Sequence, residues 1–127
     1  MDEKRLQFFL LTPEQHAKIV AYQGGCCGIC GRKLEGPHSK VLDHDHVTGL
    51  VRGELCWLCN KALGFFQDSV LLLAAATHYL NAPPATAALG IPHLGLPGRV
   101  GTKRQRKMLR KLKKNLQTAT ASLNNSR

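Results

Sequence analysis

The sequence predicts a small α+β protein in which a β-hairpin and several helices are held together by a metal site. Two Cys-x-x-Cys pairs, Cys27/Cys30 and Cys56/Cys59, lie on either side of a segment rich in β-branched and aliphatic residues around Thr48-Gly49. Helical patterns precede and follow this segment. The chain has 127 residues, but only 6% of them are aromatic, which indicates a modest hydrophobic core. We therefore expect a metal ion to stabilise the fold.

The cysteine pairs carry the strongest chemical signal. Cys27, Cys30, Cys56 and Cys59 can present four thiolates to one ion at nearly tetrahedral angles, and zinc prefers this donor set. Redox chemistry and coincidence are the alternative interpretations. Because four sulfurs leave no position for water, the zinc is expected to be structural and to contribute on the order of 10 kcal/mol to folding. Cys26 is expected to be a free thiol.

Two segments of the sequence, the N-terminus and the longest apolar run, bear on the cellular compartment. Residues 2–5 are all charged and the apolar FFLL that follows shortly after is short, so we predict no secretory signal and an intracellular protein. The longest apolar run, from Val70 to Leu80, is far shorter than the roughly 20 residues that span a bilayer. We interpret it as a buried helix and expect no membrane partner.

Local signals define the helices that surround the hairpin. Thr12, Pro13 and Gln15 have the pattern of a capping box, which predicts a helix that runs to about residue 23. A second helical segment is expected over residues 56–67. Ser69 is placed to cap a third helix that ends near Asn81.

The C-terminal half predicts two further segments. Residues 82–102 are rich in proline and glycine and are expected to form a linker. Residues 103–127 begin as a basic amphipathic helix and should become disordered from about Thr118. This division leaves residues 1–81 as the folded, metal-stabilised domain.

Charge is distributed unevenly along the chain. All 8 acidic residues lie within residues 1–68, whereas the net charge of +10 arises from residues 69–127. Such asymmetry predicts a polyanionic partner, and we favour DNA over calmodulin or an anionic membrane. The basic helix supplies the expected phosphate contacts: Lys103, Arg104, Arg106, Lys107, Arg110, Lys111, Lys113 and Lys114.

Four consecutive polar residues, Asp43, His44, Asp45 and His46, follow the first predicted strand. Taken singly, each has an ordinary interpretation as a solvated turn residue. Together they lie between two metal-binding pairs that would hold both ends of the segment in place, where catalytic groups can be kept in a defined geometry. Asn60, directly after the last cysteine of the second pair, adds a neutral oxygen ligand.

The order of these motifs resembles the phage recombination endonuclease VII family, which belongs to the His-Me finger (ββα-metal, HNH-like) nucleases. The resemblance covers roughly residues 14–68 and implies a ββα-metal core. It rests on these runs: Cys27-Gly-Ile-Cys30-Gly, Leu42-Asp-His-Asp-His46, Thr48-Gly49, Val51-Arg-Gly53, Leu55-Cys56, and Cys59-Asn60 through Leu63-Gly64.

The resemblance also implies roles for single residues. Asp43 and Asn60 would bind one catalytic Mg²⁺ or Mn²⁺, and His44 would be the general base. His46 would support the site. Because Asp43 and His44 would then act together, the regular alternation of strand side chains should fail at residues 43–46. Asp45 is expected either to fix a histidine tautomer or to hold the loop.

The family chemistry implies 5′-phosphate and 3′-hydroxyl products, branched DNA such as Holliday junctions as substrate, a homodimer, and a location in the bacterial host. Arg52 and Lys61 flank the cluster and are expected either to contact DNA phosphates or to be ordinary surface charges. The alternative functions are an HNH nuclease that nicks, homes or assists DNA packaging, and a noncatalytic zinc module that binds DNA. Asn60 together with Asp43 and His44 favours the enzyme.

Overall fold

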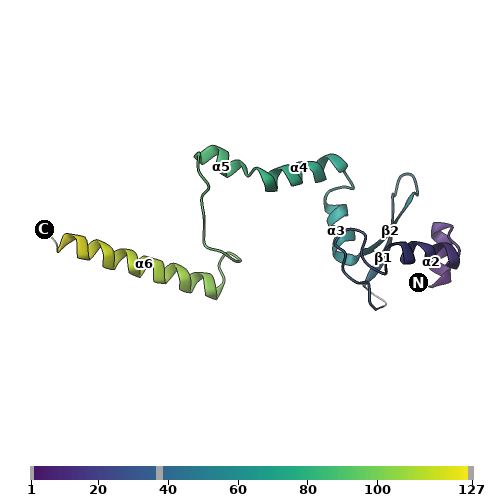
Figure 1. Cartoon of the computed structure of the whole chain (residues 1–127), viewed down its shortest axis with the longest axis horizontal. Helices are drawn as coiled ribbons and strands as arrows, with labels where there is room; N and C mark the ends of the chain where they lie inside the picture. The colour runs from purple at the N-terminus through teal and green to yellow at the C-terminus, as the bar shows by residue number, and fades with distance from the viewer. Residues whose placement is uncertain (1, 37–38, 126–127) are drawn as a thin grey trace. The chain divides into compact units, whose positions relative to one another are not determined.

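The computed structural model describes residues 2–36 and 39–125, and its contacts divide the chain into two compact units, Met1–Leu80 and Asn81–Arg127. Two antiparallel strands and the helices around them confirm the predicted small α+β class. The elements, drawn in Figure 1, are α1 (Glu3–Leu6), the 3₁₀ helix η1 (Gln7–Phe9), α2 (Pro13–Tyr22), β1 (Lys40–His44), β2 (Val51–Cys56), α3 (Trp57–Phe65), α4 (Val70–Asn81), α5 (Pro84–Leu89) and α6 (Lys103–Asn124).

Strands β1 and β2 form the predicted hairpin. Asp43 pairs with Gly53, but the register then shifts, and His44 pairs with Val51. Arg52 is thus an extra residue in β2, and a bulge of this kind bends the strand that contains it. Strand β1 ends at His44, so a regular strand does not continue through Asp45 and His46, and the expectation that regular alternation fails in this cluster is confirmed for those two residues.

Helix α2 begins as the sequence predicts. The Thr12 hydroxyl accepts a hydrogen bond from the Gln15 backbone nitrogen at 3.2 Å, and the Gln15 side-chain oxygen accepts one from the Thr12 nitrogen at 2.9 Å. Pro13 lies in the first turn, where its missing N–H has no helical partner to lose. Gly24 follows the helix with a φ of 61°, a conformation that ends helices.

The side chain of Gln23 joins the end of α2 to β2. Its oxygen accepts from the Glu54 backbone nitrogen at 2.8 Å, and its nitrogen donates to the backbone oxygens of Glu54 at 2.8 Å and Cys26 at 3.0 Å. A Cβ on Gly53 would lie 2.7 Å from the same side-chain oxygen, and Gly53 has a φ of 145°. Glycine at this position therefore allows the close approach that fixes β2.

The buried apolar core is small, as the composition predicts. It comprises Leu6 from α1, Leu42 from β1 and Leu55 from β2, together with Cys27 and Cys56 of the metal-binding pairs. Cys27 and Cys56 pack with Leu55 in one buried cluster, so part of the core is built on the metal-binding cysteines. A short N-terminal helix that the sequence analysis did not predict contributes Leu6 to it.

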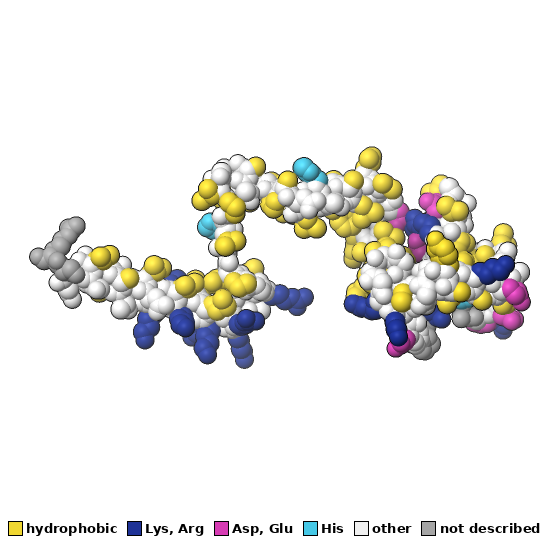
Figure 2. Space-filling model, viewed as in Figure 1, with side chains coloured by type: hydrophobic (Ala, Val, Ile, Leu, Met, Phe, Trp, Pro, Cys, Tyr) yellow, Lys and Arg dark blue, Asp and Glu magenta, His cyan; other side chains and the backbone are white. Residues whose placement is uncertain are grey.

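Helices α3 and α4 lie close to their predicted positions. The Ser69 hydroxyl accepts from the Leu72 backbone nitrogen at 3.2 Å, which confirms its role as a cap. The prediction that α4 is buried is wrong, because no residue of this helix is buried, and Leu71 is 83% exposed. Apolar side chains along α4 form an open surface in Figure 2. Hydrophobicity indicated the helix correctly, but the folded chain does not cover it.

The second unit differs from its prediction at two places. Residues 84–89 form the short helix α5, with proline in its first turn and Gly90 in the left-handed conformation after it, inside the segment expected to be a linker. Helix α6 extends to Asn124, so the disorder expected from Thr118 is wrong for residues 118–124. The Thr118 hydroxyl donates to the Lys114 backbone oxygen at 3.0 Å, and alanines favour continuation of the helix.

Helix α6 is amphipathic. The Thr102 hydroxyl caps it by accepting from the Gln105 nitrogen at 3.2 Å. Basic side chains gather along this helix in Figure 2, while Leu109 and Leu112 are about half exposed, at 45% and 48%. Across the described part of the chain, no helix combines the length and the apolar character that spanning a bilayer requires.

Candidate active site and metal centre

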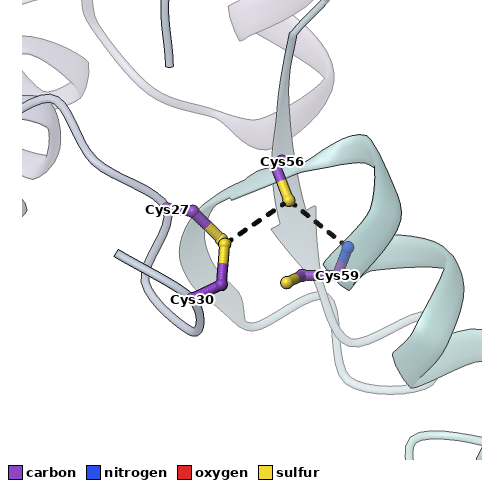
Figure 3. A group of neighbouring side chains, drawn as sticks. All are labelled: Cys27, Cys30, Cys56 and Cys59. Carbon is purple, nitrogen blue, oxygen red and sulfur yellow. Dashed lines mark hydrogen bonds between the residues drawn. The ribbon is translucent and has the colours of Figure 1, made fainter. Parts of the chain in front are cut away.

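Four cysteines converge at the junction of β2 and α3 (Figure 3). The sulfurs of Cys27, Cys30, Cys56 and Cys59 all lie within 4.8 Å of one another, and those of Cys30 and Cys56 are 3.8 Å apart. Such a group can hold one metal ion, and its all-sulfur chemistry suits structural zinc. Cys26 lies outside the group, as expected, and its sulfur is 3.5 Å from the Gly24 backbone oxygen.

The pKa values of these thiols are also consistent with a bound cation. Burial opposes ionisation of Cys27, but hydrogen bonds from the backbones of Cys30, Cys56 and Ile29 lower its pKa to about 6. Burial and the neighbouring sulfurs raise the pKa of Cys59 to about 12. Four thiolates this close repel one another, so a divalent cation is what would allow all four to ionise together.

The cysteine cluster also positions Asn60. Cys56 ends β2 and caps α3, because its sulfur accepts from the Cys59 backbone nitrogen at 3.5 Å. Asn60 therefore lies in the first turn of a helix whose start is held by two of the metal-binding residues. A half-buried carboxamide in this position is kept at a defined place beside the hairpin.

Asp43 lines three cavities of the described chain, and two of them also contain the side chains of His46 and Asn60. The smaller of these two, of about 190 Å³, is called here the histidine cavity, and the larger, of about 500 Å³, the loop cavity. The histidine cavity is lined by Arg5, Phe9, Lys40, Val41, Leu42, Asp43, His44, His46 and Asn60. The loop cavity is lined by Asp43, Asp45, His46, Val47, Arg52, Asn60, Gly64, Gln67 and Asp68.

The structure thus brings together the oxygen ligands and histidines that the sequence singled out. Asp43 and Asn60 offer hard oxygen atoms, which Mg²⁺ and Mn²⁺ prefer, and they line the same cavities. Among the described residues, the Asn60 side chain forms no hydrogen bond, so its oxygen is accessible to a ligand in the cavity. The donor set therefore fits a divalent cation bound with several water molecules.

His44 is oriented by aromatic packing. Its ring lies edge-on to that of Phe9, with centroids 5.2 Å apart and an angle of 83°, and 4.8 Å from the ring of His46. Neither imidazole hydrogen-bonds to another described residue, so the ring nitrogens remain available for a proton or a phosphate. Phe9 thus limits the directions in which His44 can point.

Asp43 is buried and ion-paired. Arg52 donates to both of its oxygens, from Nε to Oδ2 at 2.6 Å and from Nη2 to Oδ1 at 2.9 Å, and also to Asp68 Oδ2 at 3.0 Å. The hydrogen bond to Asp43 raises the pKa of Arg52, burial opposes the rise and the bond to Asp68 adds to it, so the guanidinium stays charged. Arg52 is therefore engaged by two carboxylates.

Asp45 holds the loop between the strands. Its Oδ1 accepts from the backbone nitrogens of Val47 at 2.8 Å and Thr48 at 2.7 Å, while its own backbone nitrogen donates to the Leu50 oxygen at 2.9 Å. Hydrogen bonds from Thr48 and then Val47 lower the pKa of Asp45. Of the two roles expected for this residue, the structure supports loop stabilisation.

The remaining predicted contacts lie elsewhere. Lys61 projects from α3, and its ammonium is 4.4 Å from the centroid of the Trp57 ring, in a cation–π contact. The eight basic residues predicted to bind DNA belong to α6 in the second unit. Contacts between any of these residues and DNA stay a prediction.

Sequence reasoning missed three residues near the site. Arg5 and Phe9 line the histidine cavity although they belong to the N-terminal α1 and η1, far from the cluster in sequence, and no local pattern connects them to it. Asp68 lies in the turn between α3 and α4 and pairs with Arg52 of β2. Its position as the last acidic residue of the chain was the one available signal.

Comparison with known proteins agrees with the arrangement of the first unit. The sequence model of the recombination endonuclease VII family matches residues 2–82. Over 81 residues the chain is 43% identical to the Gene 59 protein of Mycobacterium phage D29 and 41% identical to the Gene 59 protein of Mycobacterium phage L5. Each alignment covers 63% of this chain and 49% of the relative, so the chain spans about half the length of these relatives. The chain belongs to the recombination endonuclease VII family.

Proposed function

We propose that this protein is a metal-dependent DNA endonuclease of the His-Me finger type that cuts branched DNA such as Holliday junctions. One observation carries the proposal: Asp43, Asn60 and His46 line the same cavities in a family member, with His44 beside them. A hard-cation site next to an imidazole combines charge stabilisation with a general base, and this combination can hydrolyse a phosphodiester.

His44 acts as the general base. Its imidazole takes a proton from a water molecule whose oxygen attacks the phosphorus, and the bond to the 3′ oxygen breaks. The departing oxygen is protonated from solvent, which leaves a 5′-phosphate and a 3′-hydroxyl. Imidazole is the side chain that most often transfers a proton in this way near neutral pH. Phe9 restricts the ring, and His46 orients the phosphate.

Asp43 and Asn60 would hold the catalytic ion through a carboxylate and a carboxamide oxygen, since both line the same two cavities. When bound, Mg²⁺ or Mn²⁺ supplies positive charge to the phosphate and the departing oxygen. The four cysteines would hold zinc, which would have a structural role, and Cys56 joins this cluster to the start of the helix that carries Asn60.

Helix α6 supplies affinity for DNA through its eight basic residues, and its attraction to phosphates does not depend on base sequence.

A second copy of the chain covers the apolar surface of α4, where Val70 and Leu80 are 78% and 76% exposed. A homodimer would place two active sites on one branched substrate. Sedimentation of the full chain, with Leu71→Lys as the disrupting variant, tests this association.

Cleavage assays test the function directly. Supercoiled plasmid, linear duplex, a flap and a four-way junction are incubated with and without Mg²⁺, using the wild type, His44→Ala and the matched control His93→Ala. We expect Mg²⁺-dependent cutting, fastest on the junction, that His44→Ala reduces by about 10³-fold or more while His93→Ala has no effect. DNA binding without cutting on every substrate would identify a noncatalytic zinc module. Preferential cutting of duplex at one sequence would identify a nicking, homing or packaging-associated HNH nuclease.

A further inference from the structure

The contacts of Arg52 differ from those of a cation that faces solvent. Its Nε and Nη2 form a two-pronged contact with Asp43, the shorter distance being 2.6 Å, and Nη2 also reaches Asp68 at 3.0 Å. The Arg52 side chain is only 29% exposed, and that of Asp43 is 9% exposed. A bidentate pair in such a place orients the carboxylate as well as neutralising it.

The position of Asp68 is fixed by its backbone. Gln67 and Asp68 have φ values of 56° and 53°, which are uncommon for residues other than glycine. Hydrogen bonds from their nitrogens to Gly64 and Leu63, both at 2.9 Å, hold this turn at the end of α3. The Asp68 carboxylate is therefore presented to Arg52 by a defined turn.

The free lone pairs of Asp43 and the net charge of Asp43, Arg52 and Asp68 both allow a cation to bind. An ionised carboxylate offers about four lone-pair positions, and Arg52 occupies one on each oxygen of Asp43, so positions remain for a metal. With Asp43 and Arg52 alone, the net charge would be zero. Asp68 adds one negative charge, so the three residues together attract a divalent cation.

We propose that Arg52 and Asp68 are positioning residues for the divalent-cation site: Arg52 fixes the orientation of the Asp43 carboxylate, and Asp68 holds Arg52 and restores the negative charge. This inference rests on the proposed function. It assigns Arg52 a role inside the site in place of a contact with DNA phosphate. Partners that hold a ligating carboxylate typically change metal affinity by about 10- to 100-fold when they are substituted.

Binding of Mn²⁺ to the zinc-loaded full chain, measured by electron paramagnetic resonance without DNA, tests the proposal. We expect Asp68→Asn and Arg52→Lys each to weaken Mn²⁺ binding by about tenfold or more, since lysine keeps the charge but loses the two-pronged contact. Glu35→Gln, which removes an exposed acid, is the matched control and should bind Mn²⁺ as the wild type does. Thermal melting and zinc content establish that every variant is folded.

Cleavage assays should show an effect on metal binding and not on the chemical step. At saturating Mn²⁺ the two variants should cut with a kcat near that of the wild type, but with half-activation at a higher metal concentration. Unchanged Mn²⁺ affinity in both variants, or tighter binding in Arg52→Gln, would overturn the positioning role.

Measurements of DNA binding distinguish a positioning role of Arg52 from a contact between Arg52 and DNA phosphate. In metal-free buffer, Arg52→Gln should bind a four-way junction with the affinity and salt dependence of the wild type. A loss of affinity with a salt slope smaller by about one would make Arg52 a phosphate contact and overturn the inference. If Asp43→Asn leaves Mn²⁺ binding and cleavage intact, both the proposed function and this inference fail. If Asp43→Asn abolishes both while the Arg52 and Asp68 variants match the wild type, this inference alone fails.

Discussion

The imidazole of His16 and the carboxylate of Glu54 lie 2.6 Å apart in the interior, where they join α2 to β2. Glu54 is 2% exposed and His16 is 8% exposed, so water cannot replace either partner if the contact is lost. Because Glu54 follows Gly53, the cross-strand partner of Asp43, the pair fixes the strand that supports the candidate active site.

Removal of one member of this pair should destabilise the first unit. Glu54→Ala leaves the His16 ring buried without its partner, and we expect a loss of about 2 kcal/mol, which corresponds to roughly 10 °C in Tm. Thermal melting in the presence of excess zinc measures the change. Glu35→Ala, at an exposed position, is the control. Equal melting of both variants would show that the buried contact adds nothing to stability.

Loss of the metal should unfold the first unit. Cys30→Ser removes one of four clustered sulfurs, and we expect loss of bound zinc and of the cooperative melting transition, as chelation of the wild type should also produce. Metal analysis and circular dichroism follow both changes. Cys26→Ser should keep its zinc and its transition, since this sulfur lies outside the cluster. A Cys30→Ser protein that melts like the wild type would exclude a structural metal.

Asp45 should make the loop after β1 sensitive to acid. Its pKa is lowered by hydrogen bonds in the folded state, so the loop is fully stabilised above the ordinary aspartate pKa of 3.8 and loses this contribution as the pH falls through the lowered value. At neutral pH, Asp45→Ala should speed hydrogen exchange of the Val47 and Thr48 amides by roughly tenfold. Asp45→Asn, which keeps an accepting oxygen, should have a smaller effect. NMR exchange rates that do not differ among the three proteins would contradict the loop role.

The basic helix should govern the salt dependence of DNA binding. If about six of its cations neutralise phosphates, log affinity falls against log salt with a slope of about −5. Replacing Arg110, Lys111, Lys113 and Lys114 by glutamine should make the slope less negative by about 3.5. Fluorescence anisotropy over a range of salt concentrations measures it. Arg99→Gln, a single basic residue outside α6, should change the slope by at most about one.

Features encoded by neighbouring residues could be predicted well. The capping box at Thr12 and Gln15, the cap at Ser69 and the four-sulfur cluster each depend on a short pattern whose chemistry is local or whose spacing is characteristic. The end of regular strand alternation after His44 was predicted because a resemblance required it, not because the residues themselves indicated where β1 ends.

Contacts between distant segments depended on the folded chain. Phe9 beside His44, Asp68 beside Arg52, and the buried pair of His16 and Glu54 join residues whose separation in the sequence carries no repeating signal. Helix α4 shows the same division, because hydropathy identified an apolar helix but could not tell whether its own chain covers it. Local free energies determine which segments form helices and strands. The closure of long loops brings separate charged, polar and aromatic groups together, and through it the candidate active site gained Arg5, Phe9 and Asp68.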